Sequence, residues 1–152
     1  MTMTQQQDLN NLEPLLNTQQ NQLMLTFDNS DSIDTKALAM LATNVALLIF
    51  IGQAALQPHS WVQIMLVIVP YMLSLLLNIF AIWPRAYSGA SIDLDEHPEY
   101  LGYDQDTLVL QLIADTKDAI HVNSALNTKR WRYCVLSIVL TGLGTLALFA
   151  IL

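Results

Sequence analysis

Three long apolar segments, each without a charged residue, dominate this sequence of 152 residues. They cover Ala37–Ala55, Trp61–Trp83 and Tyr133–Leu152. Each segment holds the roughly 20 residues that a helix needs to cross a hydrocarbon core of about 30 Å. The segments therefore predict an all-α integral membrane protein with three transmembrane helices.

The positions of the basic residues predict how these helices are oriented. Lys36 precedes the first segment and Arg85 follows the second. The other four basic residues lie between the second and the third segment: Lys117, Lys129, Arg130 and Arg132. Because cytoplasmic loops of membrane proteins are enriched in Lys and Arg, we expect a cytosolic N-terminus and an external C-terminus.

This topology divides the chain into four parts. They are a cytosolic, Gln/Asn-rich N-terminal segment (1–33), a transmembrane hairpin (34–83), a cytosolic loop with a stalk helix (84–132) and the third transmembrane helix (133–152). The first dozen residues are expected to be disordered. Pro14 fits the first position of a short amphipathic helix, and Asp28–Asp31 is typical of a turn before the next helix.

The stalk helix is expected to begin after Asp104, which is a suitable N-cap residue. Neither Pro nor Gly separates this helix from the third transmembrane segment. The pattern predicts one continuous helix from about Asp104 to Leu152, roughly 70 Å long. A heptad-like seam favours pairing of the stalk with another helix: Leu108, Leu112, Ala119, Val122 and Leu126.

Three polar residues and a proline follow one face of the second transmembrane segment: Gln63, Pro70, Ser74 and Asn78. Their offsets place them within roughly 80° of one another on a helix. This stripe could line a water path in an oligomer, or it could form hydrogen bonds between packed helices. Since a polar stripe on a lone bundle would face lipid, we expect a homo-oligomer in the lipid bilayer.

Small and hydroxyl-bearing residues in the other two segments predict close helix packing. Asn44 lies deep in the first segment, and the third contributes Ser137, Thr141, Gly144 and Thr145. Such residues allow the backbones of membrane helices to approach closely and to exchange hydrogen bonds. The single cysteine, Cys134, is expected to be a small buried residue.

Basic and aromatic residues converge on the expected inner face of the membrane, and we predict a ligand site there. It comprises Lys36, Arg85, Lys129, Arg130, Arg132, Trp83 and Trp131. The cations could hold a small anion through charge-assisted hydrogen bonds while an indole ring stacks on a base. The alternative is that these residues anchor the chain to lipid phosphates.

The sequence carries no catalytic signature, such as a phosphate-binding glycine loop or a nucleophile elbow, so we expect a non-enzymatic protein without cofactors. One acidic stretch could form a divalent-metal site: Asp93, Asp95, Glu96, His97 and Glu99. A solvated loop is the favoured interpretation, so we expect no bound metal. The net charge of −7 argues against binding of a nucleic-acid duplex.

Several local signals, taken in order, resemble the transmembrane effectors of bacterial Pycsar anti-phage systems over about Asp34 to Leu152. These signals are Asp34-Thr35-Lys36-Ala37, Asn44, a tight hairpin, Ile82-Trp83-Pro84-Arg85, Glu99-Tyr100-Leu101, Asn127 and Lys129. The resemblance implies a multi-pass protein of the bacterial inner membrane. Such a protein would respond to a cyclic pyrimidine mononucleotide and then impair the membrane.

Two other functions are compatible with the residues alone. One is a small scaffold that anchors a cytosolic partner protein at the membrane through the stalk. The other is a small channel or transporter subunit with a constitutive function.

Overall fold

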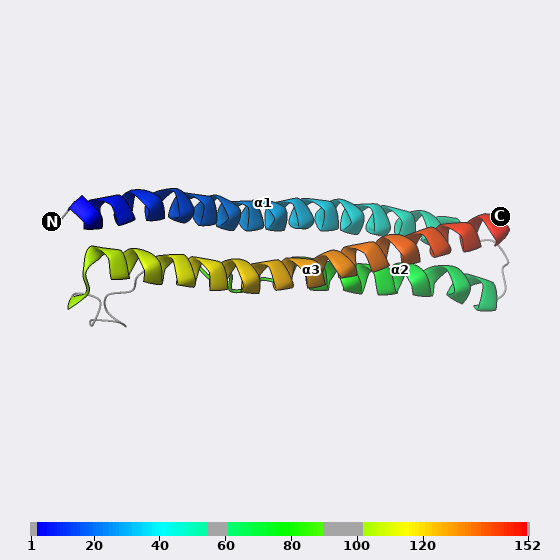
Figure 1. Cartoon of the computed structure of the whole chain (residues 1–152). Helices are drawn as coiled ribbons and strands as arrows, with labels where there is room; N and C mark the ends of the chain where they lie inside the picture. Colours follow the sequence, from blue (N-terminus) through cyan, green and yellow to red (C-terminus); the bar gives the residue numbers. More distant parts are fainter. Residues whose placement is uncertain (1–2, 55–60, 90–101, 152) are drawn as a thin grey trace. The chain divides into compact units, whose positions relative to one another are not determined.

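The computed structural model of the chain describes residues 3–54, 61–89 and 102–151. They form the helices α1 (Met3–Ala54), α2 (Trp61–Ile82) and α3 (Gln105–Ile151) (Figure 1). All three helices are long and apolar enough to cross a membrane. This confirms the predicted all-α fold with three potential spans. The acidic stretch from Asp93 to Glu99 and the mark Glu99-Tyr100-Leu101 lie outside the described residues.

The N-terminal part of the chain differs from the prediction. The structure has neither a separate helix starting at Pro14 nor a turn at Asp28–Asp31, because α1 runs without a break from Met3 to Ala54. Residues 3–12, for which disorder is expected, belong to the same helix. Helix propensity is a weak preference that packing overrides. Here the buried positions Leu23, Thr26 and Ser30 continue at helical spacing through the expected turn.

The predicted continuous helix is confirmed, since α3 runs from Gln105 to Ile151. Asp104 caps its N-terminus: the Thr107 backbone N–H donates to Asp104 Oδ1 at 3.2 Å, and the Leu108 N–H donates to the Asp104 carbonyl at 3.1 Å. Hydrogen bonds from the side chain and then the backbone of Thr107 lower the pKa of the Asp104 carboxyl below its ordinary value.

The chain forms two compact units. The first unit comprises Met1–Asn29 and Arg85–Leu126, and the second comprises Ser30–Pro84 and Asn127–Leu152. The second unit contains the most apolar parts of all three helices and is called the membrane unit below. The helices α1 and α3 each contribute one part to both units.

In the first unit, polar residues occupy part of the buried face of α3, and one of them binds the loop that follows α2. Asn123 pairs twice with the backbone of Ser88: the Ser88 N–H donates to Asn123 Oδ1, and Asn123 Nδ2 donates to the Ser88 carbonyl, both at 2.9 Å. Of the predicted seam, Ala119 is buried but Val122 is 44 % exposed. The seam within this chain runs instead along Thr116, Ala119 and Asn123, which a search for apolar residues misses.

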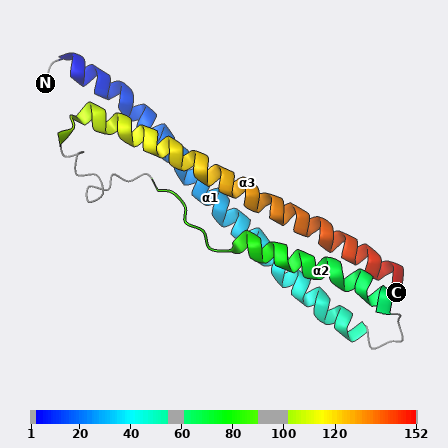
Figure 2. The same ribbon diagram turned by 90° about the horizontal axis from the view of Figure 1, so that it is seen from below.

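In the membrane unit, α1 and α3 run in the same direction and α2 runs opposite to both (Figure 2). Buried positions recur every seven residues along each helix, the spacing of helices that pack side by side. They are Ser30, Ala37, Asn44 and Ile51 on α1, Val67, Ser74 and Ala81 on α2, and Arg130, Ser137 and Gly144 on α3.

Candidate functional site

The membrane unit has polar residues inside and large apolar residues outside. The side chains of Asn44, Ser74 and Ser137 are fully buried, whereas Leu146 and Phe149 are 68 % and 73 % exposed. Water-soluble proteins show the opposite distribution. In lipid this arrangement is favourable, because polar groups must find partners within the protein. The distribution therefore indicates that this unit is embedded in a membrane.

A hydrogen-bonded network joins the three helices in the middle of this unit. Asn44 Nδ2 on α1 donates to Ser74 Oγ on α2 at 2.7 Å, and Thr141 Oγ1 on α3 donates to Asn44 Oδ1 at 2.8 Å. Ser74 Oγ also lies 2.6 Å from Ser137 Oγ and 2.9 Å from Thr141 Oγ1. We call these four residues the central network.

A second contact lies further along α3. The Tyr71 hydroxyl is 2.8 Å from Thr145 Oγ1, and the ring of Tyr71 packs against Gly144. A Cβ atom at Gly144 would lie only 2.9 Å from the ring. The glycine is therefore required here for close packing, as expected where membrane helices approach one another.

Asn78 differs from the other buried polar residues of the membrane unit. Its side chain is 0 % exposed, yet neither its amide oxygen nor its amide nitrogen has a hydrogen-bond partner among the described residues. A buried amide without a partner destabilises the folded state. The buried Asn78 amide is thus expected to lower the stability of the closed membrane unit.

The four residues of the predicted stripe on α2 differ in how far they are buried. Ser74 and Asn78 point into the unit, Pro70 is half-buried, and Gln63 is exposed. The structure thus places Ser74 in contacts between helices of a single chain.

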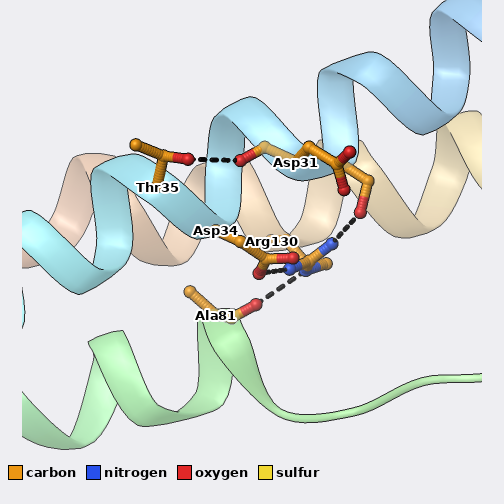
Figure 3. A network of polar contacts seen from close by, with 6 residues as sticks. Asp31, Asp34, Thr35, Ala81 and Arg130 are labelled. Atoms are coloured by element: carbon orange, nitrogen blue, oxygen red, sulfur yellow. Dashed lines mark hydrogen bonds and ion pairs between the residues drawn. The ribbon is translucent and has the colours of Figure 1, made fainter.

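Arg130 on α3 is 3 % exposed and contacts both other helices (Figure 3). Its Nε donates to the Ala81 carbonyl of α2 at 2.6 Å. One terminal nitrogen donates to Ser30 Oγ on α1 at 2.6 Å, and the other forms an ion pair with Asp34, also on α1. A single side chain therefore ties together the three helices of the membrane unit.

The hydrogen-bonding groups around Arg130 explain why its side chain is buried at this position. Ala81 lies in the last turn of α2, where backbone carbonyls have no partner within the helix. A cation is also favoured there by the helix dipole. A buried guanidinium in turn needs a counter-ion and hydrogen bonds, which Asp34 and Ser30 supply.

The other predicted ligand residues are arranged differently. Lys36 Nζ lies 5.2 Å from the ring centroid of Trp131, a cation–π contact. Lys129 and Arg132 are exposed, and Trp83 is 60 % exposed. The structure thus brings Lys36 and Trp131 together and holds Arg130 in a separate, buried cluster. Arg85 belongs to the first unit.

Ser30, Asp34 and Tyr71 were missing from the site predicted from the sequence. Ser30 falls in the expected turn, and Asp34 belongs to the signal Asp34-Thr35-Lys36-Ala37 without a predicted binding or packing role. Only Ser30 has a recognisable signal in the sequence, the seven-residue spacing of small and polar residues that links it with Ala37 and Asn44 on α1. The same spacing links Asn123, Arg130 and Ser137 on α3.

The family model PycTM, the Pycsar effector protein domain, matches residues 20–152. No curated protein and no solved structure matches the chain. The family match begins ahead of Asp34, so part of the Gln/Asn-rich segment lies within the family domain. Because the match covers well over half of the chain, the chain belongs to the Pycsar effector transmembrane family, whose members are anti-phage membrane effectors.

Proposed function

We propose that this chain is a non-enzymatic effector that makes the bacterial inner membrane permeable when a cyclic pyrimidine mononucleotide appears in the cytosol. The observation that carries this proposal is the central network, a set of polar side chains sealed between three potential spans. In the closed unit these side chains bond one another and the backbone carbonyl of Ser137. If the helices separated, they would become available to water.

The trigger is proposed to act on the equilibrium between closed and open states. A ligand shifts such an equilibrium only by binding one state more tightly than the other. The exposed cations of the membrane unit, Lys36, Lys129 and Arg132, are the candidates for contact with a phosphate. Trp83 and Trp131 are the candidates for stacking on a base, and Arg85 remains a further candidate cation.

The proposal includes assembly of several copies. The three helices of the membrane unit pack around the central network, where Asn44, Ser74 and Ser137 are each 0 % exposed. Three helices from one chain are too few to enclose a wide water-filled pore. A homo-oligomer would place the polar groups of several copies around one opening.

The ligand prediction can be tested in vesicles that contain a trapped dye. We expect cyclic pyrimidine mononucleotides to release the dye, and we expect Lys129→Gln to weaken this response about tenfold because a charge-assisted contact is lost. The matched control is Lys117→Gln, an exposed lysine of the first unit. Absence of release with every cyclic mononucleotide would contradict the proposed function. Equal responses of the two variants would remove Lys129 from the site.

The predicted topology has its own test. An alkaline phosphatase fused after Leu152 should be active, because the C-terminus is expected outside the cytosol. The same reporter fused after Ser88 should be silent. The opposite pattern would overturn the proposed orientation and the cytosolic position of the ligand site.

A further inference from the structure

We propose that Arg130 and its three partners, Asp34, Ser30 and the Ala81 carbonyl, form a latch. This latch keeps the membrane unit closed at the end where Ala81 lies. Release of Asp34 from Arg130 would open this end. The proposal rests on the proposed function, because opening has a purpose only in a membrane effector. It assigns to Arg130 the control of helix packing instead of direct ligand contact.

The first argument is geometric. The four groups of the latch come from all three helices: Ser30 and Asp34 from α1, the Ala81 carbonyl from α2, and Arg130 from α3. Each partner occupies a different nitrogen of the guanidinium. At this end of the membrane unit, no helix can move away from the other two without breaking at least one of these contacts.

The second argument concerns accessibility. Arg130 is 3 % exposed, whereas the side chain of Asp34 is 40 % exposed. The carboxylate is therefore the part of the latch that solvent or another molecule can reach. Once Asp34 is withdrawn, a buried charged guanidinium would lose this ion pair, and breaking a buried pair is strongly destabilising. If the helices moved apart and water reached Arg130, hydration of the guanidinium would reduce this destabilisation.

The third argument compares the packing at the two ends of the membrane unit. The buried residues of the cluster beside the latch are Ile33 and three small ones, Ala37, Ala81 and Cys134, and the half-buried Ile82 and Tyr133 pack against it. The cluster toward the other end contains four larger residues, Ile51, Val67, Tyr71 and Leu148. Larger side chains make more van der Waals contacts, which are a main attraction between helices in lipid. The latch end therefore depends more on its polar contacts.

The native cysteine offers a direct test. Cys134 is the single cysteine of the chain, is 1 % exposed, and lies one turn after Arg130 in the cluster beside the latch. Its rate of reaction with a membrane-permeant maleimide, measured on the full chain in vesicles, reports opening at this end. We expect Asp34→Asn to raise this rate about tenfold or more, because it removes the carboxylate charge from the ion pair with the buried Arg130.

The matched control is Asp31→Asn. Asp31 is an exposed acid one turn before Asp34 on the same helix, and its carboxylate lies outside the latch (Figure 3). This variant removes the same charge, and its labelling rate should equal that of the unchanged protein. A milder variant, Ser30→Ala, keeps the ion pair and should raise the rate about threefold by removing one hydrogen bond.

A double variant separates release of the charge from general loss of packing. Replacing both partners, with Asp34→Leu and Arg130→Met, removes the buried ion pair and puts apolar side chains in its place, so that apolar packing between the helices replaces the lost polar contacts. Such exchanges are often neutral or stabilising. We therefore expect slow labelling in the double variant and fast labelling in Asp34→Asn, with the same helical circular dichroism in both.

Two results would overturn the latch. One is an Asp34→Asn variant that reacts no faster than Asp31→Asn. The other is a double variant that reacts as fast as Asp34→Asn, since the loss of packing alone would then explain the exposure of Cys134. Neither measurement uses a nucleotide or a dye. Failure of cyclic nucleotides to release dye would therefore contradict the proposed function and leave the labelling result standing.

Discussion

Replacing Gly144 with alanine is expected to destabilise the membrane unit by about 1–3 kcal/mol, the usual cost of an overpacked core. The new Cβ atom would lie 2.9 Å from Tyr71 Cε2 and 3.1 Å from Tyr71 Cδ2. The ring cannot easily retreat, because Tyr71 is fully buried and its hydroxyl contacts Thr145. In detergent, the midpoint of thermal unfolding should fall by about 2–4 °C for each kcal/mol.

Gly142→Ala is the matched control for this prediction. Gly142 lies on the same helix two residues earlier, and a Cβ atom there would meet no atom of the described residues within 4 Å. Both exchanges raise helix propensity by the same amount, so the difference between their midpoints isolates the contact with Tyr71. Equal midpoints would mean that the ring moves aside without cost.

The membrane-spanning helices were predictable because lipid imposes strict requirements on length and charge. The expected second span, Trp61–Trp83, differs by one residue from α2. The N-terminal region was not predictable in this way. Its Asn, Asp and Ser residues favour turns locally, yet α1 continues through them. Leu23, Thr26, Ser30 and Ile33 pack against other elements at helical spacing, and this tertiary packing outweighs the local preference.

The candidate site was predictable only in part. Ser74, Asn44, Ser137 and Thr141 stand out as polar residues in apolar segments, and the structure joins them in one network. Arg130 gave no such signal, because an arginine next to a span is usually exposed. Its partners Ser30 and Asp34 are 100 and 96 residues away in the sequence. Only the tertiary structure brings these three residues together.

Two buried asparagines of the membrane unit should respond to the same substitution with opposite signs. Asn44→Leu should destabilise the protein by about 1–2 kcal/mol, because Ser74 and Thr141 lose their partner in the middle of the unit. Asn78→Leu should stabilise it by a similar amount. This substitution removes an amide that lacks a hydrogen-bond partner among the described residues, and leucine has the same branching and the same number of non-hydrogen side-chain atoms as asparagine.

The comparison is well controlled, because both side chains are 0 % exposed and both substitutions are chemically identical. Thermal unfolding in one detergent, followed by circular dichroism, gives the sign of each effect. In vesicles, Asn78→Leu should also reduce dye release by the proposed trigger. Stabilising the closed packing without changing the exposed cations makes opening less favourable. A lower midpoint for Asn78→Leu would show that its amide has a favourable partner in the folded protein, and Asn78 would then no longer count as a residue that favours opening.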